Sequence, residues 1–144
     1  MLKKLIPAAV IGAALTLGGA GAALAHHSFG AEFDPTNPVM LKGKVIQFEW
    51  ANPHSWIHID VVNPKTNQHE EWKVEGGAPS ALLRRGWDRN SLKPGTKIIV
   101  RAFRARDGDT RASAAEIAFP NGQVMSLGNP QTEAAAAAAG RAKN

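Results

Sequence analysis

Short runs in which apolar and polar residues alternate, each bounded by turn residues, set the strongest limit on how this chain folds. In residues 54–62, Ile57, Ile59 and Val61 occupy every second position. Because successive side chains of a strand point to opposite faces, this spacing predicts a strand with one buried face. Similar patterns between turn sequences predict three more strands, at residues 69–75, 97–105 and 111–119.

The earliest strand pattern, over residues 39–50, changes face part of the way along. Its apolar residues occupy odd positions up to Val45 and even positions from Ile46 onward. Such a change needs one extra residue or a sharp bend in the strand, and Gly43 is a residue at which a strand bends easily. We therefore expect a long, bent first strand.

One short helix is expected between the third and fourth strands. Residues 79–85 begin with Pro79 and are followed by Gly86, the residues favoured at a helix start and just after a helix end. The resulting order of elements, β-β-β-α-β-β, predicts an all-β protein that forms a five-stranded OB-like barrel. An open five-stranded sheet with the helix on one face is the alternative, and a short edge strand could follow, ending at Met125.

The N-terminus has the pattern of a cleavable signal peptide. Lys3 and Lys4 precede an apolar run, residues 5–24, and small residues stand at Ala23 and Ala25. This order predicts cleavage after Ala25 and export to the periplasm or the medium. A retained membrane anchor is less favoured because the run is rich in Ala and Gly. No later stretch is long and apolar enough to span a bilayer.

The rest of the chain is long enough for one domain. We expect an N-terminal arm at residues 26–38, the OB-like domain at 39–127, and a low-complexity, Ala-rich tail at 128–144 that is disordered or partly helical and carries no site. The chain contains no Cys, so disulfides do not staple the core and thiolates are not available as ligands.

The charge does not indicate a nucleic-acid partner. Removal of the signal peptide lowers the formal net charge from +5 to +3, and no basic run exceeds two residues. A partner in the cell envelope or a protein partner fits an exported chain better. We expect a solvated basic face made of Arg84, Arg85, Arg101, Arg104, Arg106 and Arg111.

Cleavage after Ala25 would create a possible metal ligand. An N-terminal His26 offers its free α-amine and its ring nitrogen, and a further imidazole completes a set of three nitrogens. Ligation of this kind suits Cu(II), and the α-amine loses its proton near neutral pH. The candidates for the third nitrogen are His27, His54 and His58. Exposed histidines with no ligand role are the alternative.

The second strand gathers several of these residues. His54, Trp56 and His58 are spaced by two, which places them on the face that does not line the core. Phe29 and Phe33 could dock the N-terminal arm against this end of the barrel. Trp56 is then a stacking platform for a ligand, a lid over a metal, or a side chain covered by the arm.

The other tryptophans are expected to have structural roles. Trp72 alternates with Val74 and is expected in the core, whereas Trp50 and Trp87 could close the two ends of the barrel. The expected ligand face carries Trp56 and Trp50.

Catalysis finds little support in the sequence. It contains no nucleophile elbow, no phosphate-binding Gly loop and no HExxH motif. Asp60 and Glu71 should lie close together if the second and third strands pair, but on an open face that does not desolvate an acid–base pair. We therefore expect a binding protein rather than an enzyme.

Several segments together resemble an uncharacterised family of small exported bacterial proteins, a domain of unknown function. They are residues 26–29, 45–58, 80–87 and 91–95, which read HHSF, VIQFEWANPHSWIH, SALLRRGW and SLKPG. The resemblance covers about residues 26–127 and implies no activity. The expected N-terminal His is also similar to that of histidine-brace copper proteins. A small OB barrel with His and Trp on its strands is similar to the periplasmic copper chaperone of the Cus system, although Met40 and Met125 lie outside the His–Trp group.

Three functions follow as hypotheses. The first is a periplasmic copper-binding protein that uses His26 with His27 or His54, with His58 or Trp56 nearby. The second is a metal-free envelope module of the OB type that binds a glycan, a lipid headgroup or a protein. The third is a purely structural role in envelope stress.

Overall fold

The computed structural model describes residues 29–141, which form six strands and two helices after a helical turn at residues 29–32. The predicted signal peptide, residues 1–25, and His26 and His27 lie outside the described residues. Along the chain the elements are β1 (Phe33–Glu49), β2 (Trp56–Val62), β3 (His69–Glu75), α2 (Pro79–Leu83), β4 (Lys97–Ala105), β5 (Arg111–Ala118), β6 (Val124–Ser126) and α3 (Pro130–Arg141).

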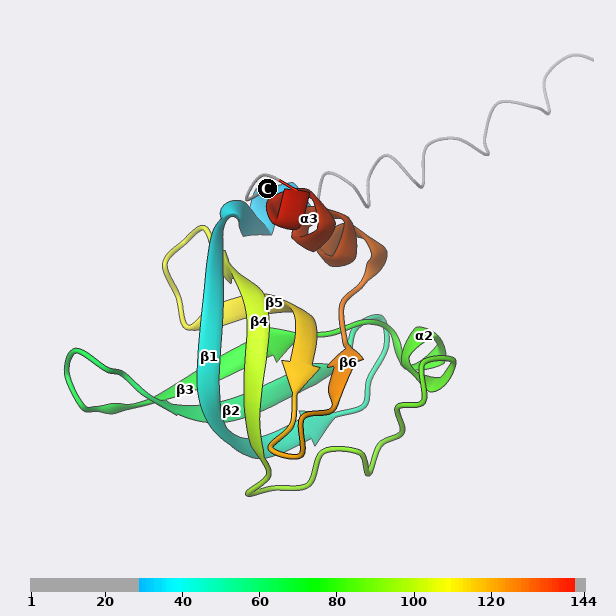
Figure 1. Ribbon diagram of the computed structural model, residues 1–144, viewed down its shortest axis with the longest axis horizontal. Coiled ribbons are helices and arrows are strands. Elements are labelled where there is room, and N and C mark those ends of the chain that lie inside the picture. The colour runs from blue at the N-terminus through cyan, green and yellow to red at the C-terminus, as the bar shows by residue number, and fades with distance from the viewer. Residues whose placement is uncertain (1–28, 142–144) are drawn as a thin grey trace, which may run out of the picture.

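The strands form a mostly antiparallel six-stranded sheet in the order β3-β2-β1-β4-β5-β6. A parallel pairing between β3 and β5 joins the first five strands into a ring of hydrogen bonds. In Figure 1 the β2–β3 hairpin extends from one side of this ring, α2 lies on the opposite side, and α3 lies across one end. The prediction of a β-rich fold with a short helix between β3 and β4 is confirmed.

Strand β1 is long because both of its edges are paired. The part of β1 up to and including Lys44 pairs with β4, and the part from Gly43 onward pairs with β2. The two pairings therefore overlap at Gly43 and Lys44. A Cβ atom on Gly43 would lie 2.4 Å from the Asp60 carbonyl oxygen, closer than side chains tolerate. Glycine is therefore required where β1 passes between its two neighbours.

The expected change of face in β1 occurs, but not at Gly43. The register with β2 shifts between Val45 and Gln47, which leaves Ile46 as the extra residue of a bulge. Ile46 is exposed, whereas Val45 is buried. Of the two devices considered from the sequence, the extra residue is found, at Ile46, whereas Gly43 serves a close approach of the β2 backbone.

The inside of the ring is filled by apolar side chains. Trp72 is buried there, as predicted. The expectation that Trp50 and Trp87 close opposite ends is wrong, because Phe48 contacts both, with ring centroids 5.4 Å and 6.3 Å away. The two indoles belong to one aromatic group because Trp87 is drawn into the core, where its Nε1 donates to the carbonyl of Ser126.

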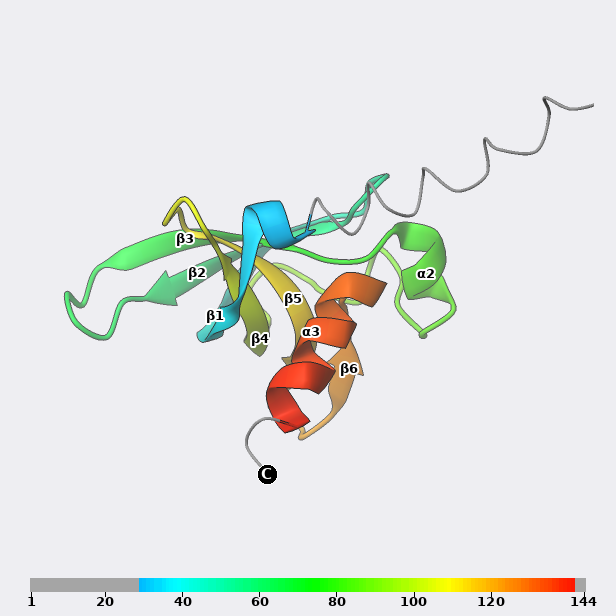
Figure 2. The same ribbon diagram turned by 90° about the horizontal axis from the view of Figure 1, so that it is seen from above.

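The C-terminal segment is an ordered part of the fold. Of the two expected states, disordered or partly helical, the helix is found: α3 packs on β1 and β5, and Figure 2 shows it beside β5 and β6. Phe33 and Phe103 form a second small core, with Phe29, Ala135 and Ala136 packed against it. The expected docking of the N-terminal arm through its phenylalanines is confirmed for the described part of the arm.

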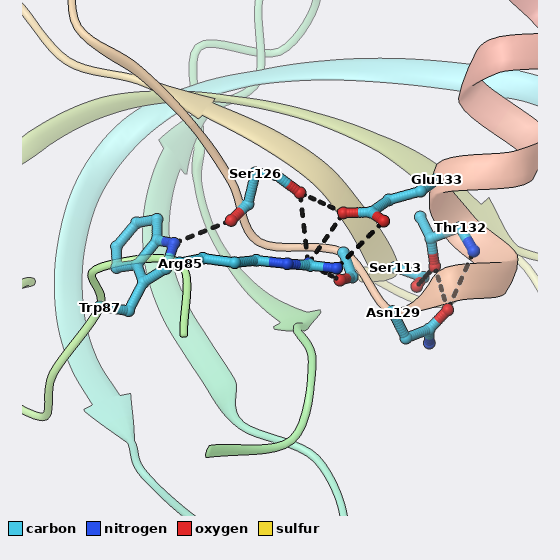
Figure 3. Close-up of polar contacts among 8 residues, drawn as sticks. Arg85, Trp87, Ser113, Ser126, Asn129, Thr132 and Glu133 are labelled. Carbon is cyan, nitrogen blue, oxygen red and sulfur yellow. Dashed lines mark hydrogen bonds and ion pairs between the residues drawn. The ribbon is translucent and has the colours of Figure 1, made fainter. Parts of the chain in front are cut away.

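Polar contacts fix the start of α3 (Figure 3). Arg85 donates to the carbonyl of Gly128 at 2.6 Å and forms an ion pair with Glu133 at 2.8 Å. The hydroxyls of Ser113 and Thr132 are hydrogen-bonded at 2.7 Å in a buried position. The expectation that Arg85 belongs to a solvated basic face is therefore wrong, because its guanidinium anchors the helix α3.

The expectation that the first strand begins at residue 39 is wrong, because β1 begins at Phe33 through its pairing with Ala105, so residues 33–38 of the expected arm belong to the sheet. Other ends differ from the predictions by one or two residues. Strand β2 begins at Trp56 rather than residue 54, α2 ends at Leu83, and β5 ends at Ala118. The short edge strand expected near Met125 is β6. Within residues 29–141, neither helix is long and apolar enough to cross a membrane.

The close approach at Gly43 leads to a stability prediction. Gly43→Ala should lower the free energy of unfolding by about 1–3 kcal/mol, because the added methyl pushes the backbone of β2 away. Urea denaturation followed by tryptophan fluorescence measures the change. Gly30→Ala, where nothing lies within 4 Å of the new Cβ, is the matched control and should stay within about 0.5 kcal/mol of the wild type. Equal stability of all three proteins would contradict the requirement for glycine.

Candidate functional site

A pocket of about 330 Å³ lies where the N-terminal arm and the start of α3 meet the sheet. The arm contributes Phe29, Glu32 and Phe33, and the segment around α3 contributes Asn129 and Gln131. The sheet side consists of His54, Trp56 and Glu75. The pocket is thus lined by both segments for which the sequence predicted a metal ligand nearby, the N-terminal arm and the start of β2. It also uses a tail that was expected to carry no site.

Glu75 is the buried carboxylate of this pocket. The residue is 5% exposed, and the amide of Asn129 donates to its Oε1 at 3.2 Å. Burial raises the pKa of the Glu75 carboxyl to about 7, and the negative charge of Glu32 acts in the same direction. The hydrogen bond from Asn129 and the charge of Arg111 lower the pKa but do not cancel these effects.

His54 lies beside this carboxylate. Its Nδ1 is 3.2 Å from Glu75 Oε1, and its side chain is 41% exposed. Among the described residues, no hydrogen-bond partner is found for the Nε2 of His54. A carboxylate beside one ring nitrogen orients an imidazole and leaves the other nitrogen for a metal, which is the usual arrangement around metal-binding histidines.

Backbone hydrogen bonds hold His54 next to Glu75. The amide of Ser55 donates to the carbonyl of Gly77, and the amide of Gly76 donates to the carbonyl of Ser55. These bonds, at 3.1 Å and 2.8 Å, continue the β2–β3 pairing beyond the ends of both strands. The segment before β2 is therefore fixed against β3, although it is not itself a strand.

His58 has a different environment from His54. Its Nε2 is 2.8 Å from Glu49 Oε1 and its Nδ1 is 2.7 Å from Glu71 Oε1, so both ring nitrogens are engaged. His58 does not line the pocket that contains His54. Within residues 29–141, no three His, Asp or Glu side chains are grouped in a way that could hold a metal ion.

Trp56 lies at the side of the pocket and is half-buried. The Lys73 ammonium is 4.8 Å from the centre of its ring, within range of a cation–π contact. Phe29 and Phe33 of the arm line the same pocket as Trp56. Trp50 packs with Phe48 against the main core and is not among the pocket residues.

Sequence reasoning did not find Glu75 or Asn129. Glu75 pairs directly with Trp56 in the strand register, so the alternation pattern already places it on the outer face of β3. Its burial depends on the arm and on the segment that contains Asn129, and nothing in an Ala-rich tail predicts that it returns to this face. The expected neighbours Asp60 and Glu71 do pair across β2 and β3, and each binds a histidine instead of the other.

A family model matches most of the chain. The model of a family described as being of unknown function, DUF6152, matches residues 14–114. The matched range includes His54, Trp56 and Glu75 and ends before Asn129. No curated protein and no solved structure matches the chain.

The raised pKa of Glu75 predicts a pH-dependent stability. Because the folded chain binds this proton more tightly than the unfolded chain, stability is highest below about pH 4.5 and falls as the pH rises towards about 7. Glu75→Gln keeps the size and an acceptor oxygen but carries no charge. Without metal, it should raise the free energy of unfolding at pH 8 by roughly 1–3 kcal/mol and change it much less at pH 4.5.

Thermal denaturation at the two pH values measures this difference. The control is Glu116→Gln, which removes a half-exposed carboxylate that pairs with Arg101. It should change stability by no more than about 1 kcal/mol at pH 8, and in the destabilising direction. A Glu75→Gln protein that is less stable than the wild type at pH 8 would show that the carboxylate is not strained by burial.

Proposed function

Since the chain belongs to DUF6152, a family of unknown function, we propose its role from the pocket itself: a small exported protein that binds copper. The proposed ligands are His54 and the His26 that signal-peptide cleavage after Ala25 would place at the N-terminus. His26 supplies its α-amine and its imidazole, and His54 supplies Nε2. Trp56 shields one side of the metal.

The observation that supports this proposal most is that His54 lies in one pocket with Phe29 of the arm. Only two residues, His27 and Ser28, separate His26 from Phe29, so their Cα atoms are at most about 11 Å apart. The new N-terminus therefore stays within reach of the pocket. The carboxylate of Glu75 next to Nδ1 of His54 supplies the orienting contact that metal-binding imidazoles usually have.

His54 is a better third ligand than His58. To bind a metal, His58 would have to give up its contact with Glu49 or with Glu71, at 2.8 Å and 2.7 Å. His54 keeps its carboxylate contact and still offers the second ring nitrogen. His27, next to the N-terminus, stays in the proposal as an additional ligand.

The chemistry of the ligands favours copper. An α-amine and imidazoles form a nitrogen-rich set, which suits the tetragonal geometry of Cu(II). The chain has no Cys, so a thiolate zinc site is not proposed. The proposed role is to bind and carry the metal in the periplasm or outside the cell, rather than to catalyse a reaction.

We also propose that the ring of five strands is an OB-like barrel. The sequential pairing β4-β1-β2-β3, the parallel contact of β3 with β5, and a short helix between β3 and β4 support this assignment. Strand β6 and α3 are then additions to the barrel.

A metal-free envelope module is the second candidate. The half-buried indole of Trp56 with Lys73 above its ring favours it, because an aromatic face beside a cation suits a glycan or an anionic headgroup. The two candidates differ in whether binding depends on the free N-terminus.

One test of the copper proposal uses the free N-terminus. The protein that begins at His26 should bind Cu(II) tightly, and a version with one extra Ala before His26 should bind it roughly a hundredfold more weakly or worse, because the chelate of amine and imidazole is lost. Competition with a chelating dye measures the affinity, and electron paramagnetic resonance reports the nitrogen ligands. Absence of binding, or equal binding by both versions, would overturn the proposal.

Another test of the copper proposal concerns His54, the proposed third ligand. His54→Gln should weaken Cu(II) binding by about tenfold or more, because it removes a ligand from the oriented pocket. The matched control is His69→Gln, whose side chain is 71% exposed in the β2–β3 hairpin and contacts Asp60. Its affinity should stay at the wild-type value. A loss for His69→Gln that equals the loss for His54→Gln would indicate non-specific binding by surface histidines.

A further inference from the structure

A second hollow lies on the outside of the sheet, over β1, β2, β4 and the end of β5. Its volume is about 450 Å³, larger than that of the pocket beside His54, and it shares no lining residue with that pocket. It lies at Gly43, where β1 is paired with β2 and β4 at once. The residues that matter for its chemistry are Lys42, Lys44, Lys97, Ile99, Ala118 and Phe119.

The floor of this hollow is apolar. Ile99 of β4 and Ala118 of β5 are direct partners in the sheet, and both are partly exposed on its outer face. Phe119 extends the apolar surface beyond the end of β5, and Val62 of β2 adds a side chain that is 44% exposed. A concave apolar surface of this kind is typical of small-molecule sites rather than of an ordinary solvated sheet face.

Three lysines surround the apolar floor. Lys44 pairs with Lys97 across β1 and β4, and Lys42 pairs with Ile99, so all three side chains leave the same outer face. All three are exposed. Within residues 29–141, no carboxylate forms an ion pair with any of the three ammonium groups. The aliphatic part of each lysine can lie along the apolar floor while its charge stays in water.

The remaining charged groups do not neutralise the lysines. Asp60 is the acidic residue that lines the hollow, and its carboxylate is bound by Nδ1 of His69 at 2.8 Å. The hollow therefore combines an apolar floor, three cationic groups and one carboxylate that already has a partner. A ligand that matches it has an apolar part and an anionic end.

We propose that this hollow binds a single-chain amphipathic carboxylate, with the apolar chain on Ile99, Ala118 and Phe119 and the carboxylate among Lys42, Lys44 and Lys97. The site is concave and holds about 450 Å³, which suits one chain. A bilayer surface would require a flat or protruding apolar face instead. The proposal is independent of the copper site, because the two hollows share no residue.

Decanoate, used below its micelle concentration, is the probe. Titration into the isotopically labelled protein should give saturable chemical-shift changes at the amides of Lys44, Ile99 and Ala118, and none at the amides of His54 and Glu75. The double variant Lys44→Gln/Lys97→Gln should weaken binding by about tenfold or more, since two charge-assisted contacts are lost. Decanol, which has the same chain without the charge, should bind more weakly than decanoate.

The matched control is Lys65→Gln/Lys93→Gln, which removes the same charge from exposed positions outside this hollow. It should bind decanoate like the wild type. Ala118→Trp should fill the hollow and abolish binding, and the double lysine variant keeps the test valid if the tryptophan prevents folding. The proposal would be overturned by any of three results: no saturable binding of decanoate, equal weakening in the control, or binding only to phosphatidylglycerol vesicles.

Discussion

The whole structure depends on one strand that is hydrogen-bonded along both edges. Strand β1 pairs with β4 in its first part and with β2 in its second part, and both pairings include Gly43 and Lys44. A single strand in this position connects the two halves of the sheet, and the parallel contact of β3 with β5 completes the ring. At Gly43 the backbone carbonyl of Asp60 in β2 approaches β1 too closely for a side chain, which explains the glycine. The bulge at Ile46 then turns the following residues so that Phe48 faces the aromatic group.

The terminal segments turn one exposed sheet face into a pocket. Without α3 and the arm, Glu75 would be a surface carboxylate opposite Trp56. Phe29 and Phe33 on one side and the Arg85–Glu133 ion pair on the other hold these segments in place. The carboxyl of Glu75 is buried at this place, and burial raises its pKa to about 7. A buried carboxyl with a raised pKa in a pocket is typical of functional sites.

Alternation of apolar and polar residues predicted most of the strands, because a strand with one buried face leaves a direct record in the sequence. Strands β3 and β4 were predicted with their observed bounds, and the core position of Trp72 followed from the same pattern. Alternation carries no information on which distant segments cover the outer face. For this reason the partners of His54 and His58 could not be distinguished in advance, although the two residues are only four positions apart. The roles of Arg85 and Trp87 were missed for the same reason, since both contact the segment around Ser126 and Gly128.

The filled interior of the ring determines where ligands can bind. Trp72, Trp87 and the buried aliphatic side chains occupy the inside, so that the two hollows considered above both lie outside the ring. Each arises from a different physical cause. One forms where segments distant in sequence cover the sheet, so its shape depends on the packing of α3 and of residues 29–33. The other forms where β1 passes between two strands at Gly43, and it is lined by the sheet and by Phe119 and Pro120 directly after β5. Loss of α3 should therefore dismantle the His54 pocket and leave the lysine-rimmed hollow intact, which makes the two sites separable within one small domain.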